Sequence, residues 1–438
     1  MSTLLIEGGY PLKGRVKIFG AKNSSFKLMI ASLLTDSKSD ILNVSYLRDV
    51  TTLKKIIENL GAGALFLGDH RIVVKANNLN SYKIPTRLGQ ESRASTMLIP
   101  ILLHRFGKAI VPLPGGDKIG ERPLQRHLNG LEAMGVKITY KGQKLFAEAR
   151  KLEGMKYRFG KNTHTGTETL ILAASVANGI TILENAAQEP EVDDLILFLN
   201  KAGAKIKRQE RTITIEGVKT LHGTKHRCMT DRNEAVTFAC MALGTKGDIF
   251  IENILPIHLK AFLTKVKEAG GGVEITENGI RFFYKENLKA TWLETSAYPG
   301  FMTDWQPLWS TLMTQVKGKS TVIERVFENR FIFVDTLKEM GADIEFFNPK
   351  ISKPQTYYNF DWSREKAKLK HGIKIKGPTP LQGTSVVITD IRAGATLTFA
   401  ALMGRGASEL SGLEHIERGY EDLEGRLASL GANIKRED

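Results

Sequence analysis

Cysteine is scarce in this chain: only two of its 438 residues are cysteines, Cys228 and Cys240, and no CxxC pair occurs. Two cysteines cannot build the disulfide framework of a secreted domain, so the sequence predicts a protein of a reducing compartment. Long apolar runs are also missing, because stretches such as Leu170–Val176 fall well short of the ~20 residues that span a bilayer. The start of the chain lacks the basic region of a signal peptide. We therefore expect a cytoplasmic protein without a membrane partner.

Acidic residues are outnumbered, since 62 lysines and arginines stand against 47 aspartates and glutamates and leave a net charge of +15. This excess favours an anionic partner but does not choose among nucleic acid, a membrane surface and phosphorylated metabolites. Hydrophobic residues make up 42% of the chain, enough for sizeable cores, which argues against disorder. The length predicts roughly two to four domains.

One sequence pattern recurs along the chain: an amphipathic run is followed by a glycine with a small or β-branched neighbour and then by a short strand. Its glycines are spaced by 74, 68, 67, 71 and 90 residues and are Gly61, Gly135, Gly203, Gly270, Gly341 and Gly431. Glycine at such a place ends a helix by adopting the left-handed conformation. A second helix is expected in each unit, over Ser24–Leu34, Ala94–Arg105, Thr167–Ala177, Glu234–Gly244, Trp305–Val316 and Gly394–Met403. Six units with two helices and several short strands each predict a layered α/β architecture.

The last spacing is longer than the others by about 20 residues, and the surplus lies at 348–371. This segment is rich in lysine, tyrosine and proline and lacks apolar periodicity. We interpret it as a solvated surface insertion or a subunit contact.

Basic residues stand at the starts of several second helices, where the helix dipole disfavours them. They are Lys22, Arg93, Arg232 and Arg392. A cation at such a place has a use if it joins the helix amides in binding an anion. If the units pack symmetrically, several helix starts converge, and the sequence then predicts a site for a phosphorylated or carboxylated substrate.

The segment 112–123 is the most unusual in the chain. Glycines and prolines surround Asp117, and two basic residues and a second acidic residue follow it closely. Such a composition indicates a water-facing loop, and an aspartate there is often only a turn residue. The functional interpretation is a lid that carries an acid to a closed site.

Together these residues resemble one family, the UDP-N-acetylglucosamine 1-carboxyvinyltransferases, over the whole chain except 348–371. The resemblance rests on Gly20-Ala21-Lys22-Asn23, Arg93-Ala94-Ser95, Pro114-Gly115-Gly116, Ile119-Gly120 with Arg122-Pro123, Glu189-Pro190-Glu191, Phe327-Glu328-Asn329-Arg330-Phe331, Thr389-Asp390-Ile391-Arg392-Ala393 and Arg418-Gly419-Tyr420. It implies two similar domains, each an inside-out α/β barrel of three βαβαββ-type repeats. The N-terminal domain would hold residues 22–229 with the loop 112–123. The C-terminal catalytic domain would hold residues 1–21 and 230–438, with the insertion at about 348–371.

The resemblance also implies an activity, namely transfer of the enolpyruvyl group of phosphoenolpyruvate to the 3-hydroxyl of UDP-N-acetylglucosamine with release of phosphate. This is the first committed step of peptidoglycan synthesis, and it needs no metal and no cofactor. The implied site lies in a cleft that closes on substrate. The implied catalytic residues are Asp117, Asp304, Lys22 and Arg418. The implied substrate-binding residues are Lys22, Asn23, Arg93, Arg122, Pro123, Leu124, His164, Thr165, Gly166, Asp304, Val326, Arg392 and Arg418.

Within this likeness Asp304 is the candidate base, and Lys22, Arg93, Arg122 and Arg418 would clamp phosphoenolpyruvate, with Arg392 nearby. Asn23, Asp304 and Val326 would face the sugar. The segment Arg122-Pro123-Leu124 and the helix start at Thr163–Gly166 would hold uridine and its diphosphate.

The chain departs from the family pattern at a few positions. Many members carry cysteine where this chain has Asp117, and a carboxylate attacks an epoxide far less readily than a thiolate does. We therefore predict resistance to the epoxide antibiotic fosfomycin. His164 replaces a small hydroxyl residue that is usual in the family. Gln125 replaces an acidic residue near uracil, and Met302 replaces a proline. These replacements leave the reaction type intact, but they do not settle which nucleotide the chain prefers.

Two other functions compete with this one. The sister enzyme 3-phosphoshikimate 1-carboxyvinyltransferase shares the sixfold architecture, and a basic nucleic-acid-binding protein would account for the charge. The second needs a basic stripe with exposed aromatic residues, for which 350–371 is the only local candidate. We expect a monomer or weak homo-oligomer that binds the two small substrates and no nucleic acid, and the histidines show no metal-ligand spacing.

Overall fold

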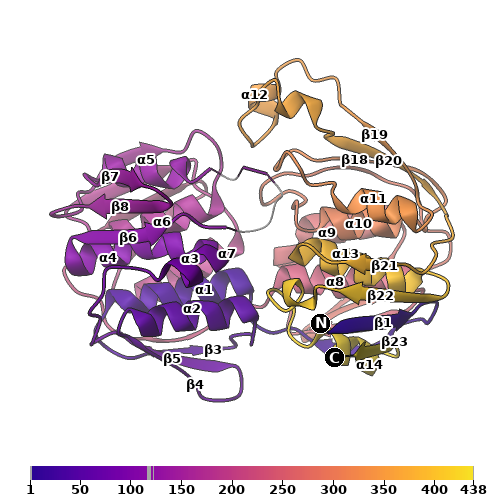
Figure 1. Ribbon diagram of the computed structural model, residues 1–438, viewed down its shortest axis with the longest axis horizontal. Helices are drawn as coiled ribbons and strands as arrows, with labels where there is room; N and C mark the ends of the chain where they lie inside the picture. The colour runs from indigo at the N-terminus through magenta and orange to yellow at the C-terminus, as the bar shows by residue number, and fades with distance from the viewer. Residues whose placement is uncertain (1, 116–119, 122, 438) are drawn as a thin grey trace. The chain divides into compact units, whose positions relative to one another are not determined.

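The computed structural model describes residues 2–115, 120–121 and 123–437, and its chain divides into two units (Figure 1). The C-terminal unit comprises Met1–Ile18 and Thr230–Asp438, together with Gly120 and Glu121. The N-terminal unit comprises Phe19–Gly116 and Pro123–Met229. Asp117 and Arg122, two of the predicted site residues, lie outside the described residues.

Each repeat builds one sheet, and the fifth repeat shows the common plan. It runs β17 (Trp292–Glu294), α10 (Gln306–Met313), β18 (Gly318–Ile323), α11 (Phe333–Glu339), β19 (Asp343–Phe347) and β20 (Gly372–Gly377). The sheet order is β17-β18-β20-β19, with β17 and β18 parallel and the other neighbours antiparallel. Over the described residues there are six sheets, of which five have this four-stranded mixed plan, whereas the sheet of the second repeat has three strands that all pair antiparallel. The predicted βαβαββ repeat is therefore confirmed in five of the six units.

The N-terminal unit contains the first three repeats. The first has β13 (Lys225–Arg227), α1 (Lys22–Ala31), η1 (Ser32–Leu34), β3 (Ser39–Leu42), α2 (Arg48–Asn59), β4 (Gly63–Phe66) and β5 (Arg71–Lys75). The second has α3 (Thr86–Glu91), η2 (Arg93–Leu98), α4 (Ile99–Phe106), β6 (Lys108–Pro112), α5 (Gln125–Ala133), β7 (Lys137–Lys141) and β8 (Lys144–Glu148). The third has β9 (Lys156–Arg158), α6 (His164–Ala174), β10 (Ile180–Glu184), α7 (Pro190–Lys201), β11 (Lys205–Gln209) and β12 (Thr212–Glu216).

The C-terminal unit contains the other three. The fourth repeat has β2 (Lys13–Lys17), α8 (Arg232–Gly244), β14 (Asp248–Glu252), η3 (Pro256–Leu259), α9 (Lys260–Glu268), β15 (Gly272–Thr276) and β16 (Gly279–Phe283). The fifth repeat also holds α12 (Pro354–Tyr357) and η4 (Lys366–Lys368). The sixth has β21 (Ser385–Val387), α13 (Ile391–Met403), β22 (Ala407–Ser411), η5 (Leu413–His415), α14 (Leu423–Ser429), β23 (Asn433–Glu437) and β1 (Thr3–Glu7).

Three strands complete repeats that are distant from them in sequence. β13 pairs in parallel with β3 of the first repeat, and β2 pairs in parallel with β14 of the fourth. β1 pairs antiparallel with both β22 and β23, so the first strand of the chain closes the last repeat. The chain therefore changes unit twice between repeats, after Ile18 and after Met229.

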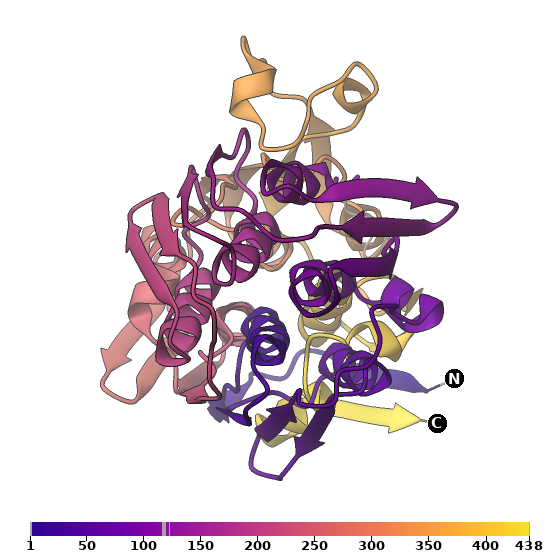
Figure 2. The same cartoon turned by 90° about the vertical axis from the view of Figure 1, so that its left-hand side faces the viewer.

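One helix of each repeat is mostly buried, as its continuous apolar sequence requires, namely α1, α4, α6, α8, α10 and α13. In α8 and α13 almost every residue is buried, and α8, α10 and α13 pack against one another. The helices α1, α4 and α6 belong to a separate core in the N-terminal unit. Figure 2 looks onto this unit and shows helices near its middle with strands toward its edges, the inside-out arrangement that the resemblance implied. No helix among the described residues is both long and apolar enough to cross a bilayer.

All six repeat glycines follow the amphipathic helices and have positive φ, between +81° at Gly270 and +105° at Gly341. At Gly135, where φ is +89°, the nearest atom to an added Cβ would be 4.0 Å away. An alanine there meets no steric clash, so its effect on stability comes from the left-handed backbone conformation alone. We expect Gly135→Ala to lower the free energy of unfolding by about 1–2 kcal/mol in urea titrations. The matched control, Gly160→Ala, has open space and no positive φ and should change it little. Equal stabilities would contradict the left-handed helix end.

The insertion differs from the sequence interpretation, because it encloses a small aromatic core rather than being solvated throughout. Tyr358 stacks on Trp362 with ring centroids 4.8 Å apart and on Phe360 at the same distance, and Phe360 stacks on His371 at 5.3 Å. Tyr358 and His371 are only 2% and 1% exposed. The apolar pattern was missed because aromatic side chains at irregular spacing pack without a helix or strand period.

Candidate functional site

In the C-terminal unit, hydrogen bonds join the starts of α8, α10 and α13. The indole Nε1 of Trp305, which precedes α10, donates to Asn233 Oδ1 in the first turn of α8 at 2.9 Å. Asp304 Oδ1 accepts a hydrogen bond from Arg392 Nε, in the first turn of α13, at 3.3 Å. Arg392 Nη1 lies 3.1 Å from the Tyr420 hydroxyl. The predicted convergence of helix starts is therefore present within this unit.

Asp304 lies between two guanidinium groups. Its Oδ1 is 3.0 Å from Arg330 Nη2 and 3.3 Å from Arg392 Nε. The side chain of Arg330 is only 3% exposed, whereas that of Asp304 is 27% exposed. Water is thus excluded from one side of the carboxylate, while the other side can meet a ligand. Sequence reasoning named Arg330 as part of a family string but gave it no role.

Glu324 was also missed, and it holds the backbone around two predicted residues. Its Oε1 accepts hydrogen bonds from the backbone N–H groups of Val326 at 2.7 Å and Phe327 at 3.1 Å. Its Oε2 accepts one from the hydroxyl of Thr303, next to Asp304, at 3.0 Å. Burial raises the pKa of Glu324, while the charge of Arg330 and the two backbone hydrogen bonds act in the opposite direction. The chain has no motif that could have revealed this residue, because its partners lie in two separate segments.

The N-terminal cap of α13 fixes the backbone position of Arg392. Asp390 caps α13 by accepting hydrogen bonds from the N–H groups of Arg392 and Ala393 at 2.8 and 3.0 Å. Burial acts to lower the pKa of the Arg392 guanidinium, but its interactions with Tyr420, Asp304 and Asp231 outweigh burial and raise it. Arg418 lies in the turn two residues before Tyr420, the residue that contacts Arg392.

Arg232 stands at the start of α8, as expected, but aromatic rings enclose it. It is fully buried, and its guanidinium lies over the rings of Tyr298 at 5.0 Å and Trp305 at 5.8 Å. Cation–π contacts within the core therefore hold Arg232, and its expected role in binding an anion stays a prediction.

In the N-terminal unit, Lys22 opens α1 and Asn23 follows it in the same first turn. Lys22 Nζ lies 3.2 Å from Asp49 Oδ2 at the start of α2, and both side chains are mostly buried, at 16% and 8% exposure. Arg93 opens η2, whose cap Ser92 accepts a hydrogen bond from the N–H of Ala94 at 3.3 Å. Each of these cations therefore stands at a helix start, as predicted.

The start of α6 carries His164, Thr165 and Gly166. Thr163 caps this helix by accepting a hydrogen bond from Gly166 N at 3.2 Å. Glu168 is fully buried, and its Oε1 lies 3.1 Å from both His164 Nε2 and Lys27 Nζ. Burial acts to lower the pKa of His164, but the charge of Glu168 outweighs it and raises the pKa. The cationic form of His164 is thus favoured at this helix start.

Beyond the segment that lies outside the described residues, Pro123 is exposed and Leu124 packs partly against the core just before α5. Gln125 is hydrogen-bonded to Asn129 in the same helix, and Met302 is buried beside Thr303. Cys228 and Cys240 are buried, as the sequence analysis expected. Among the residues that the structure describes, no three His, Cys, Asp or Glu side chains are grouped so that they could hold a metal ion.

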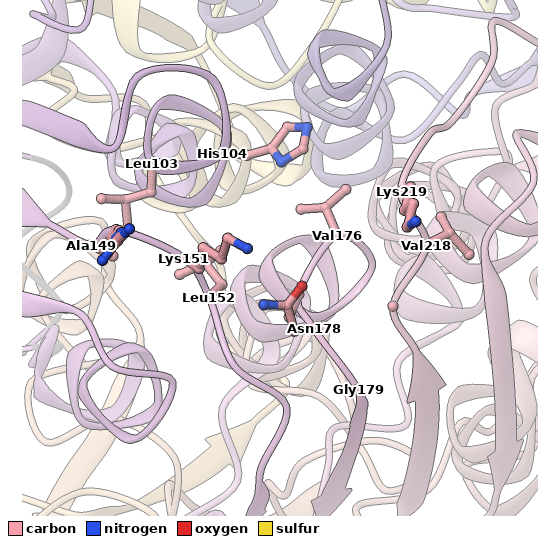
Figure 3. Close-up of a pocket in the computed structure, with 13 residues that line it drawn as sticks. Leu103, His104, Ala149, Lys151, Leu152, Val176, Asn178, Gly179, Val218 and Lys219 are labelled. Atoms are coloured by element: carbon pink, nitrogen blue, oxygen red, sulfur yellow. The ribbon is translucent and has the colours of Figure 1, made fainter.

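A pocket of about 420 Å³ lies in the N-terminal unit near the ends of α4 and α6 (Figure 3). Its lining residues are Leu103, His104, Ala149, Arg150, Lys151, Leu152, Val176, Ala177, Asn178, Gly179, Gly217, Val218 and Lys219. The predicted residues stand instead at the start of α6. Since the 11 residues of α6 span about 16 Å, this pocket is separate from them.

Buried Glu234, in the first turn of α8, should make the stability of the C-terminal unit depend on pH. Burial raises its pKa to about 7, although its partner Arg426 acts to lower it. Between about pH 4.5 and 7 the folded chain keeps a proton that the unfolded chain loses, so this group makes stability fall as pH rises. Glu234→Gln should flatten that fall in urea unfolding at pH 5 and pH 7. Exposed Glu277→Gln is the control, and an unchanged slope for Glu234→Gln would count against the shift.

Solved structures define the class of this fold. The enolpyruvyl transferase NikO from Streptomyces tendae is 23% identical and covers 99% of this chain and 98% of its own, with a TM-score of 0.86. An EPSP synthase from Acinetobacter baumannii is 16% identical with a TM-score of 0.74 and covers all of both chains. The family model of EPSP synthase (3-phosphoshikimate 1-carboxyvinyltransferase) matches residues 6–427. The fold is therefore that of the enolpyruvyl transferases.

Sequence relatives narrow the class. A relative from Halothermothrix orenii is 40% identical over 438 residues, which are all of both chains. One from Protochlamydia amoebophila is 40% identical over 445 residues and covers 99% of this chain and 94% of its own. Both are named UDP-N-acetylglucosamine 1-carboxyvinyltransferase. The chain belongs to this family of enolpyruvyl transferases.

Proposed function

We propose that the chain transfers the enolpyruvyl group of phosphoenolpyruvate to the 3-hydroxyl of UDP-N-acetylglucosamine and releases phosphate, the first committed step of peptidoglycan synthesis. The observation that carries the proposal is the 40% identity to a relative of that name over the full length of both chains. The resemblance of the motifs around Lys22, Arg93, Asp304, Arg392 and Arg418 supports it.

The reaction needs an acid, a base and cations. The sugar oxygen forms a bond to the central carbon of phosphoenolpyruvate as the hydroxyl loses its proton, and the vinyl CH2 takes up a proton to become a methyl group. The bond to the phosphate oxygen then breaks and the methyl group gives up a proton, which restores the double bond. Asp304 is the proposed acceptor of the hydroxyl proton, and Asp117 is the proposed acid.

The proposed binding roles follow the charges of the substrates. Lys22, Arg93, Arg122 and Arg418 bind the phosphate and carboxylate of phosphoenolpyruvate, with Arg392 beside them. Asn23, Asp304 and Val326 face the sugar. The uridine diphosphate is held by Arg122-Pro123-Leu124 and by the start of α6. There Thr165, Gly166 and His164 meet the anion, as helix N–H groups favour.

We also propose that the N-terminal unit provides the nucleotide-binding helix start and that the C-terminal unit provides the base. The enzyme works as a monomer or weak homo-oligomer, without a metal or cofactor.

The test measures phosphate release from phosphoenolpyruvate with each of two acceptors, UDP-N-acetylglucosamine and shikimate 3-phosphate. The second acceptor is included because the family model that matches this chain carries the description 3-phosphoshikimate 1-carboxyvinyltransferase. We expect turnover with the first acceptor and none above background with the second. Turnover with shikimate 3-phosphate alone would replace the proposed function by its sister reaction.

A further inference from the structure

The insertion 348–371 is fixed to the C-terminal unit by specific contacts. Arg325 Nη2 donates to the backbone oxygen of Tyr357 at 3.1 Å, its guanidinium lies 4.1 Å from the centre of the Tyr357 ring, and the N–H of Asn359 donates to the backbone oxygen of Arg325 at 2.8 Å. His371 Nε2 is 2.8 Å from the backbone oxygen of Lys366. The aromatic core and these contacts hold η4, which carries Lys366, in a defined place.

Lys366 is a buried lysine, only 8% exposed, although its neighbours Ala367 and Lys368 are exposed. Its Nζ lies 2.9 Å from Glu121 Oε2 and 3.6 Å from Glu328 Oε1. Burial acts to lower its pKa, but Glu121, Glu328 and Asp361 outweigh burial and raise it. A buried ammonium of this kind is stable only while its carboxylate partners stay close.

Glu328 binds the same short segment through the backbone. Its side chain is 6% exposed, and its Oε1 accepts a hydrogen bond from the N–H of Glu121 at 2.9 Å. A Cβ on Gly120 would lie 2.3 Å from Glu328 Oε2, so this carboxylate approaches closer than any side chain at position 120 would allow. Gly120 and Glu121 are the two residues before Arg122 in the sequence.

We propose that Lys366 is a positioning residue, an ammonium supplied by the insertion that neutralises Glu328 and holds Gly120 and Glu121, the two residues that precede Arg122 in the sequence, a residue proposed to bind phosphoenolpyruvate. The pair with Glu121 contributes little by itself, because the Glu121 side chain is 71% exposed. The larger effect comes from Glu328, because removing the Lys366 ammonium leaves its carboxylate buried without the cation that lies 3.6 Å from Oε1. The insertion therefore serves the reaction through a residue that lies outside the repeats, and this inference rests on the proposed function.

Steady-state kinetics test the role. We expect Lys366→Met to lower kcat/KM for phosphoenolpyruvate about tenfold, mainly through KM, because it removes a charge-assisted contact. Lys366→Arg should recover part of the loss, and Lys368→Met, which changes an exposed lysine of the same turn, should match the wild type. The loss from Lys366→Met combined with Glu328→Gln should be smaller than the product of the two single losses. A normal kcat/KM for Lys366→Met, or losses that multiply, would overturn the inference.

Hydrogen exchange supplies a readout that does not need turnover. The Glu121 amide, bonded to Glu328, should exchange slowly in the wild type and faster in both Lys366→Met and Glu328→Gln, but not in Lys368→Met. If the wild type shows no phosphate release while exchange responds as expected, the proposed function fails and the placement by Lys366 stands. If the wild type is active and neither hydrogen exchange nor kcat/KM responds to Lys366→Met, the role of Lys366 is ruled out and the proposed function stands.

Discussion

Replacing Asp304 by asparagine should lower kcat by about 10²–10⁴-fold, the range typical for loss of a general base. The amide keeps an oxygen in the place of Oδ1, where Arg330 and Arg392 donate at 3.0 and 3.3 Å, so the substrate-binding surface changes little. It cannot take up the proton of the sugar hydroxyl. KM for both substrates should therefore stay within a few-fold while phosphate release falls.

The control for this variant is Asp335→Asn, which changes an exposed carboxylate on α11 and should leave kcat unchanged. Thermal unfolding of both variants checks that the fold persists, because the buried Arg330 keeps an acceptor in Asp304→Asn. Full phosphate release by Asp304→Asn would remove the assignment of the base.

The repeat architecture could be predicted from sequence because its signals are local. A glycine after an amphipathic run fixes a helix end through its own φ, so Gly61 and Gly431 could be assigned without knowing their neighbours. Lys22 and Arg392 could be placed at helix starts in the same way. What followed from the residues themselves was the sixfold α/β plan and a set of cations at helix starts; the named activity came from the resemblance.

The features that were missed depend on residues far apart in the chain. Arg232 and Arg392 look alike in sequence, yet one lies over the rings of Tyr298 and Trp305 and the other lies beside Asp304. Glu324 acts on Thr303, 21 residues earlier. The insertion was taken as solvated because its aromatic residues follow no period. In each case tertiary contacts decide the role, and one sequence does not contain them.

Asp117 gives the second prediction of a large effect, and it rests on sequence alone because this residue lies outside the described part of the chain. The wild type should keep its activity during incubation with fosfomycin, whereas Asp117→Cys should lose activity with time. A cysteine thiolate attacks an epoxide carbon, the S–C bond forms as the C–O bond breaks, and the released alkoxide takes a proton. A carboxylate is a much weaker nucleophile in that step.

The chain offers matched controls for this experiment. Its own thiols, Cys228 and Cys240, are 1% and 0% exposed, and burial raises the pKa of Cys240, so neither supplies a reactive thiolate. Asp117→Ser introduces a small side chain without a thiol and should stay resistant, and mass spectrometry of the inactivated Asp117→Cys variant should find the added mass at position 117. Time-dependent inactivation of the wild type, or an active Asp117→Cys variant that stays insensitive, would show that the residue at 117 does not decide the response to the epoxide.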